Sequence, residues 1–223
     1  MLYAVIAVVE GIIPLVFIPW GQRTVDSAIA AILLAMVPIF VLCLAPLFSR
    51  SERWTLVAFI SVALGFAGII VLLAPSVTGN LLANLFGELL ILVAAACWAI
   101  GIILMKRIPQ ISPFLAIRNI FALAAFPTVP LALVIEQPWA HAVTIESVLA
   151  LLALGVISGG IAYGLFLYMV MRTGPTFSSL VGYLVTLFGV LFGIVFMGDP
   201  FGGNDFVAIL LIAAALAAAR LKL

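Results

Sequence analysis

The sequence is poor in charged residues, which make up only 8% of its 223 positions, and it has one histidine and two cysteines. Hydrophobic residues account for 67% of the chain, and the mean hydropathy is +1.46. A water-soluble domain of this size needs far more polar surface than these residues can supply. The net charge of +1 gives no reason to expect a nucleic-acid partner.

The side chains that usually carry catalysis are equally scarce. His141 falls in an expected loop, so neither a metal cluster nor a Ser/His centre can be assembled within the apolar segments. No P-loop and no paired-aspartate motif occurs. Cys43 and Cys97 lie inside apolar segments, where cysteines most often serve as packing residues. We therefore expect no enzyme activity, no bound metal and no cofactor.

The sequence does contain eight long apolar runs, separated by short polar segments. They cover residues 2–21, 27–49, 54–74, 81–105, 112–135, 145–171, 175–197 and 204–221. Runs of about 20 residues are long enough for a helix to cross the bilayer's hydrocarbon layer of about 30 Å. They lack the alternation of barrel strands. The first run has no basic leader or A-x-A-like cleavage site, so we expect a helix rather than a signal peptide. The pattern predicts an all-α membrane protein with the lipid bilayer as its partner.

The basic residues gather on one side of these expected spans. Those that follow the even-numbered spans are Arg50, Arg53, Lys106, Arg107, Arg172, Arg220 and Lys222. The other side has Arg23 alone, together with several acids. Short loops rich in Lys and Arg stay in the cytoplasm. We therefore expect a multi-pass protein of the inner or plasma membrane with both termini in the cytoplasm.

The early and late thirds of the chain share a weak internal repeat. Gly11, Phe17, Arg23 and Thr24 recur at one common offset as Gly160, Phe166, Arg172 and Thr173. The repeat aligns the first three spans with the last three, which come five spans later. Because five is odd, the second copy lies upside down in the membrane. Inverted repeats of this kind build many secondary transporters and allow them to alternate between inward-open and outward-open states.

Several motifs resemble one transporter family. They are Pro38 followed by Ser51-Glu52-Arg53, the glycine-rich run at 64–73, Gly87-Glu88-Leu89-Leu90, Ala95-Ala96-Cys97-Trp98-Ala99, Lys106-Arg107, Pro113 with Arg118, and Thr173-Gly174-Pro175 with Ser178-Ser179. Over essentially its whole length the chain is similar to the EamA branch of the drug/metabolite transporter superfamily. It departs from the family pattern at Asp199, where Glu is expected, and at Thr186, where Pro is common.

The resemblance implies ten helices in two repeats of five. On that basis residues 1–75 are the last three helices of the first repeat and 79–223 are the second repeat, so the first two helices are absent. It also implies secondary active transport of a small organic solute (a metabolite, amino acid or drug) by alternating access, with export favoured. The scarcity of buried charge argues against a highly charged solute. The alternative is a truncated or non-transporting membrane subunit. A homodimer could supply packing surface for the spans at 2–21 and 112–135.

Glu10 is the strongest candidate for a functional residue. It lies near the middle of the first expected span, where a charged side chain costs about 2.5–3.5 kcal/mol on insertion scales. It could exchange a proton during a transport cycle. The alternative is that the first helix begins later and leaves Glu10 near the membrane surface.

The other candidate pathway residues are polar or aromatic. Arg118 is either a snorkelling interfacial residue or, with Asn119, an anchor for an anionic or amide group. Trp98, Tyr163 and Tyr183, with Ser158 and Thr186 nearby, are either donors to the central cavity that the resemblance implies or satisfied core residues.

Glycines and prolines indicate where helices pack and bend. The pairs Gly160 with Gly164 and Gly189 with Gly193 have the small-xxx-small spacing that lets helices approach closely. Pro38 is expected to kink the second span, and the prolines of the fifth span are expected to kink that helix.

Overall fold

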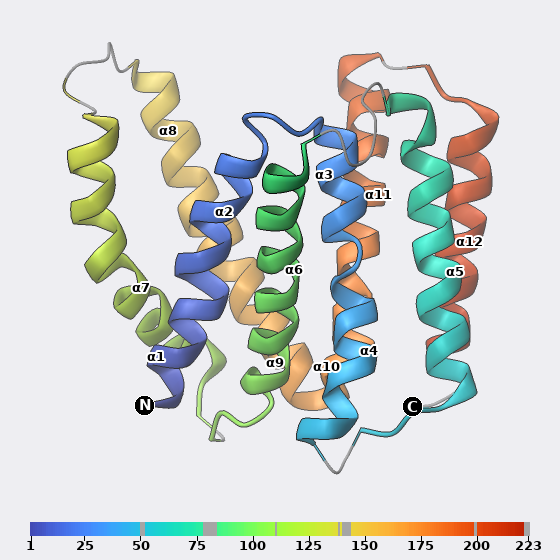
Figure 1. Ribbon diagram of the computed structural model, residues 1–223, viewed down its shortest axis with the longest axis horizontal. Helices are drawn as coiled ribbons and strands as arrows, with labels where there is room; N and C mark the ends of the chain where they lie inside the picture. The colour runs from blue at the N-terminus through green and yellow to red at the C-terminus, as the bar shows by residue number, and fades with distance from the viewer. Residues whose placement is uncertain are drawn as a thin grey trace.

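The computed structural model describes residues 1–49, 52–77, 84–109, 111–137, 139, 144–198 and 200–220. No residue in these ranges belongs to a β-strand, and eight helical segments are long and apolar enough to cross a membrane (Figure 1). The predicted all-α membrane fold is therefore confirmed. Some residues named above lie outside the described ranges, namely Arg50, Ser51, His141, Asp199 and Lys222.

The spans agree closely with the predicted apolar runs. The first three consist of α1 (Leu2–Ile6), η1 (Ala7–Ile12) and α2 (Ile13–Gly21), then α3 (Ser27–Leu34) and α4 (Val37–Phe48), then α5 (Leu56–Leu73) with η2 (Ala74–Ser76). The fourth and fifth are α6 (Leu85–Met105) and α7 (Pro113–Glu136). The last three consist of α8 (Ile145–Ala153), η4 (Leu154–Ala162) and α9 (Tyr163–Thr173), then α10 (Pro175–Ser179), α11 (Val181–Phe192) and η5 (Gly193–Met197), then α12 (Gly203–Arg220).

Local sequence explains where several helices begin or break. The Asp26 side chain accepts a hydrogen bond from the Ala28 backbone N–H at 2.8 Å and so caps α3. Thr55 caps α5 in the same way. The second span is interrupted between Leu34 and Val37, directly before Pro38, whose nitrogen has no hydrogen to donate. The fifth span differs, because α7 is a single helix that contains two prolines.

Three spans contain π-helical turns, which the apolar pattern of the sequence does not predict. They are η1 in the first span, η4 in the sixth and η5 in the seventh. A π turn adds a residue to the helical repeat, is unfavourable in isolation and is frequent at functional sites. The first two occupy corresponding positions in the internal repeat, since Gly11 lies in η1 and Gly160 in η4.

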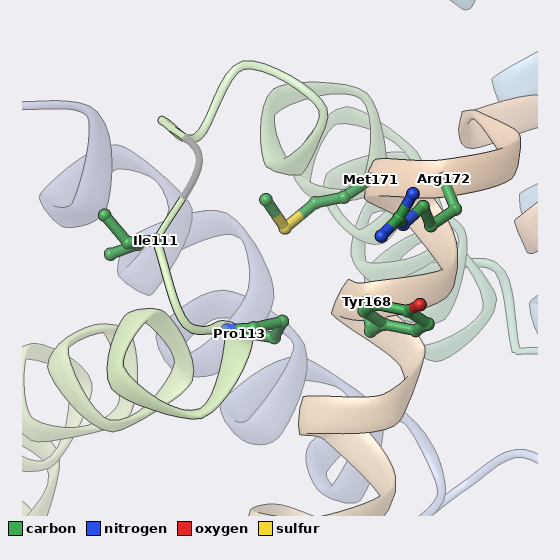
Figure 2. A pocket seen from close by; sticks show the side chains of 5 residues that line it. All are labelled: Ile111, Pro113, Tyr168, Met171 and Arg172. Carbon is green, nitrogen blue, oxygen red and sulfur yellow. The ribbon is translucent and has the colours of Figure 1, made fainter.

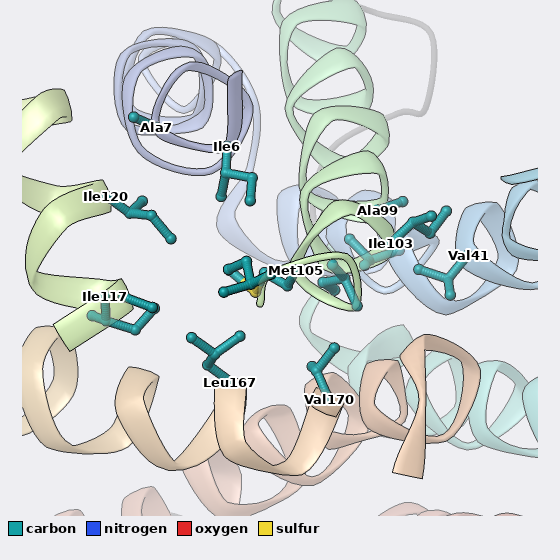
Figure 3. Close-up of a cluster of buried hydrophobic side chains, with 14 of the residues drawn as sticks. Ile6, Ala7, Val41, Ala99, Ile103, Met105, Ile117, Ile120, Leu167 and Val170 are labelled. Carbon is teal, nitrogen blue, oxygen red and sulfur yellow. The ribbon is translucent and has the colours of Figure 1, made fainter. Parts of the chain in front are cut away.

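The buried side chains form two main clusters. The first joins the first span to α4, α6, α7 and α9, and includes Ile6, Met105 and Leu167 (Figure 3). The second joins α5, α11 and α12 around the fully buried Tyr183. In Figure 1, α5 and α12 stand side by side at the edge of the bundle opposite α7 and α8.

Basic residues gather at one end of the bundle, which we call the basic end; its described members are Arg53, Lys106, Arg107, Arg172 and Arg220. The start of α1 and the end of α12 also lie there (Figure 1). Contacts across this end connect helices distant in sequence. Lys106 Nζ donates to the Met171 carbonyl at 2.8 Å, Arg107 donates to the Phe48 carbonyl, and the Thr176 hydroxyl donates to Glu52.

The spans differ greatly in how far the protein itself covers them. Half of the fourth span is buried inside the protein, whereas the fifth is 17% buried and the sixth only 6%. The face formed by α8, η4 and the outer side of α7 is therefore apolar and exposed, as expected for a surface that contacts lipid tails or other helices.

Candidate functional site

The candidate site is centred on Glu10, which lies in the π-helical segment of the first span. Its side chain is only 4% exposed. The structure therefore places Glu10 inside the bundle rather than at the membrane surface. Ionisable residues buried in a membrane protein are costly and usually have a functional role.

One oxygen of the Glu10 carboxyl group is held by a hydrogen bond and the other is not. The Tyr163 hydroxyl, at the start of α9, donates to Glu10 Oε2 at 3.1 Å. Among the described residues Glu10 Oε1 has no hydrogen-bond partner, although it is fully buried. Leaving a buried polar atom without a partner costs on the order of 1–3 kcal/mol, so this atom calls for an explanation.

The fourth span supplies the rest of the immediate surroundings. The Trp98 indole N–H donates to the Glu10 backbone carbonyl at 3.2 Å. One turn further along α6, Gly101 lies directly beneath the Glu10 side chain. A Cβ atom at Gly101 would collide with Glu10 Cγ and Oε1. Gly101 therefore provides the space that the carboxyl group occupies.

Two aromatic rings contact the Tyr163 ring. The Phe121 and Tyr163 rings meet edge to face, with centroids 5.2 Å apart, and the Phe166 ring contacts Tyr163 in a similar way at 6.1 Å. Such pairs fix the orientation of each ring. The Tyr163 hydroxyl is therefore held in position toward Glu10.

A layer of apolar side chains closes the site on the side of the basic end. On each of the three helices, the residue one turn nearer that end is fully or almost fully buried: Ile6 precedes Glu10, Met105 follows Gly101 and Leu167 follows Tyr163. Figure 3 shows these three side chains converging. We call Ile6, Met105 and Leu167 the apolar plug. It lies between Glu10 and the basic end along these helices.

The remaining predicted residues are not part of this group. The Arg118 guanidinium donates to Asn119 Oδ1 at 3.0 Å on an exposed face of α7. Ser158 is exposed on η4, and the Thr186 hydroxyl donates to the Gly182 carbonyl of its own helix. Tyr183 belongs to the second cluster, where its hydroxyl donates to the Val62 carbonyl at 3.3 Å. The structure thus brings together Glu10, Trp98 and Tyr163 from the predicted set.

The glycines singled out from spacing differ in their surroundings. Gly164 lies against the Phe114 ring of α7, where an added Cβ would clash. Gly160 and Gly189 have no neighbouring helix that close to an added Cβ, and Gly193 is the first residue of η5. The closest approaches involve other glycines, such as Gly65, where an added Cβ would collide with the Tyr183 ring.

Sequence reasoning missed Gly101 and the π segments. The signal for Gly101 was present, because residues three apart on a helix share a face and Trp98 is three residues earlier. A small residue on the face of a deep tryptophan indicates that another group packs there. No comparable signal indicates a π turn, because the sequence of η1 is as apolar as its surroundings apart from Glu10.

The sequence of this chain is also similar to those of known proteins. Residues 85–220, more than half of the chain, match the model of the EamA-like transporter family. The uncharacterized inner membrane transporter YedA of Escherichia coli K12 is 29% identical over 84% of this chain and 60% of its own length. A chloroplastic WAT1-related protein of Arabidopsis thaliana is 24% identical over 86% of this chain and 48% of its own length. The chain thus spans about half to 60% of the length of these relatives.

The fold is also shared with a protein of known crystal structure. The two superpose with a TM-score of 0.84 over 99% of this chain and 75% of the other, at 19% sequence identity. At that identity the likeness shows the fold alone. The eight apolar helices, the motifs that they carry and the match over α6 to α12 lead to one conclusion: the chain belongs to the EamA-like transporter family.

Proposed function

We propose that this protein moves a small organic solute across the membrane by alternating access, coupled to a proton that Glu10 binds and releases. The observation that carries this proposal is the buried Glu10 carboxyl group, with one oxygen held by Tyr163 and the other without a hydrogen-bond partner among the residues that the structure describes. A carboxyl group buried in a membrane protein is a common proton carrier in pumps and transporters. Because Tyr163 donates to Oε2, the free Oε1 is the atom on which a proton would reside.

In this proposal the apolar plug controls access to Glu10 from the basic end. In the proposed mechanism the fully buried Ile6, Met105 and Leu167 close the path from Glu10 to the basic end in this conformation. Exchange with the basic side then requires the first, fourth and sixth spans to separate. Such a separation is the movement that alternating access demands of an inverted-repeat carrier. The Lys106 and Arg107 contacts at the basic end would break in the same movement.

We place the basic end in the cytoplasm, with both chain ends there. The support is the distribution of charge: Arg53, Lys106, Arg107, Arg172 and Arg220 share one end, whereas Arg23 lies at the other. Basic residues in short loops are retained on the cytoplasmic side.

The solute we propose carries little net charge, because few charged side chains lie within the spans. Metabolites, amino acids and amphipathic drugs all meet this description. Export is the direction we favour, on the family resemblance described above.

The experiment uses purified protein in liposomes that contain a pH-sensitive dye, with a panel of amino acids and lipophilic amines added outside. We expect at least one solute to cause proton movement, and we expect Glu10→Gln to abolish that movement. Glu88→Gln is the matched control, since Glu88 is also a buried acid but lies in the first turn of α6. Solute-linked proton movement that survives Glu10→Gln at the wild-type rate would exclude Glu10 as the carrier.

A second candidate is a membrane subunit that does not transport by itself. The specific observation in its favour is the sixth span, of which only 6% is buried inside the protein. Further helices, whether from a partner or a second copy, would cover that face. Absence of flux in liposomes, together with flux after co-reconstitution with a partner isolated from the same membrane, would favour this candidate.

A further inference from the structure

A cavity at the basic end lies apart from the Glu10 site. Its volume is about 420 Å³, and it is lined by Ile111 and Pro113 at the start of α7 and by Tyr168, Met171 and Arg172 near the end of α9 (Figure 2). The transport proposal does not use the side chain of any of these five residues. Their chemistry is mixed, with one cation, one aromatic ring and three apolar side chains.

The cation is held in a defined position. The Arg172 guanidinium stacks over the Tyr168 ring, with its central carbon 5.4 Å from the ring centroid. Figure 2 shows the guanidinium above the ring, with Pro113 across the cavity. No ion pair joins Arg172 to any carboxylate in the described part of the chain. Stacking occupies the face of a guanidinium and leaves its N–H edges available to bind an oxyanion in a bidentate manner.

Further positive charge lies close to this group. Lys106 Nζ is hydrogen-bonded to the carbonyl of Met171, the residue directly before Arg172. Pro113 is the first residue of α7, so the positive end of that helix faces the same space. The cavity is therefore suited to a negatively charged group.

The helices beside the cavity also expose apolar side chains. Around the cavity, Phe114 and Leu115 of α7 and Leu165 of α9 are each about half exposed, at 51%, 47% and 56%. Gly164 lets α9 approach the Phe114 ring closely, about one turn of α9 from Tyr168, so α7 and α9 are in contact beside the cavity. A molecule that binds Arg172 in the cavity would therefore also meet exposed apolar helix faces.

We propose that this cavity binds the phosphate of an anionic glycerophospholipid, with Arg172 on the phosphate oxygens and the acyl chains along α7 and α9. The exposed apolar side chains of α7 and α9 beside the cavity favour a lipid over a soluble anion. Both a positively charged group and an apolar surface are needed for such recognition, and clusters of basic residues next to a span attract anionic lipids. The proposal does not depend on the transport mechanism.

The experiment measures lipid binding to the purified protein by native mass spectrometry, with phosphatidylglycerol, phosphatidylethanolamine and inorganic phosphate as separate probes. We expect phosphatidylglycerol to bind more tightly than phosphatidylethanolamine, and Arg172→Gln to weaken that binding about five- to tenfold. Arg172→Lys should keep part of the affinity, since it retains the charge but loses the planar fork. Phosphate at millimolar concentration should not displace the lipid.

Arg23→Gln is the matched control. Arg23 stacks on Trp20 in the corresponding place of the first repeat, with its guanidinium carbon 6.0 Å from the ring centroid, but it lies at the opposite end. Equal losses in the Arg172 and Arg23 variants would overturn the proposal, because they would indicate general attraction to charge. Displacement of the lipid by millimolar phosphate would also overturn it and would identify a soluble anion as the ligand.

Discussion

The two π-helical segments η1 and η4 occupy corresponding places in the first and sixth spans, yet their surroundings are opposite. In η1, Ala7 and Glu10 are buried, and the segment packs against both α6 and α7. In η4, Val156 and Ile157 are about 60% exposed, and α7 is the main neighbouring span. Each span ends with an arginine stacked on an aromatic ring, Arg23 on Trp20 and Arg172 on Tyr168. The backbone features are thus shared, whereas the burial is not.

This difference indicates what a π turn contributes to the site. The widened helix is present in both spans, but an acid occupies only the shielded one, where Tyr163 and Trp98 can bond to it. At the corresponding place η4 has glycines, among them Gly159 and Gly160. The chemistry therefore comes from the neighbours of the π turn rather than from the turn itself, and four predictions test that conclusion.

The largest expected difference is in the free energy of unfolding, between a variant in the first span and a variant in η4. Ile6→Ala should lower the free energy of unfolding by about 2 kcal/mol or more, because Ile6 is fully buried in the apolar plug and its removal leaves a cavity. Ile157→Ala in η4 should cost less than about 0.5 kcal/mol, since that side chain is 59% exposed. Unfolding of detergent-solubilised protein by SDS measures both. Equal losses would mean that η4 is as well packed as η1.

Two glycines, Gly101 against η1 and Gly159 within η4, should differ almost as strongly. Gly101→Ala should cost about 1–3 kcal/mol by overpacking and should displace Glu10, so that solute-linked proton movement falls about tenfold or more. Gly159→Ala should do neither, because its Cβ would meet the Phe121 ring at an ordinary distance of 3.9 Å. Full proton movement in the Gly101 variant would contradict the arrangement described for Glu10.

Removing the Tyr163 hydroxyl should have an intermediate effect. Tyr163→Phe leaves Glu10 Oε2 buried without its donor, so we expect a loss of about 1–2 kcal/mol in the free energy of unfolding. Tyr3→Phe, in the same span as Glu10, is the control. If the double variant Tyr163→Phe with Glu10→Gln is as unstable as the sum of the two single variants, the pair is not coupled.

The smallest effect should come from Trp98. Trp98→Phe keeps a ring but removes the N–H that bonds to the Glu10 carbonyl, at an expected cost of about 0.5–1.5 kcal/mol. Trp54→Phe, at a position that is 64% exposed, should change stability by less than about 0.5 kcal/mol. The same SDS titration distinguishes them, and a reversed order would exclude a role for the indole in holding η1.

Much of the fold could be predicted from the sequence, since long apolar runs and polar breaks are direct consequences of bilayer thickness. The predicted spans match the described helices, and the family follows from motifs on them. The site was predictable only in part. Glu10 stands out because an acid is rare in such a segment, but its pairing with Tyr163 depends on how the first and sixth spans cross.

The way the helices cross also explains why two similar tyrosines, Tyr163 and Tyr183, lie in different places. Tyr183 and Tyr163 are alike in sequence context, yet Tyr183 packs against Gly65 of α5 and satisfies its hydroxyl on a backbone carbonyl there. In spans that are apolar on every face, periodicity does not tell which face meets which neighbour. Helix–helix contacts therefore had to come from the structure.

The pairing of α5 with α12 has a consequence for how the protein is made. Gly68 of α5 lies against Ile212 and the Ala208 carbonyl of α12, so these two helices depend on each other for their closest contact. Four candidate spans lie between them in the sequence. During synthesis, the surface of α5 around Gly68 is therefore not covered by α12 until α12 has been inserted into the membrane. An assembly factor or a neighbouring lipid that shields this face would act only in that interval, and slowing translation between the two helices would lengthen it.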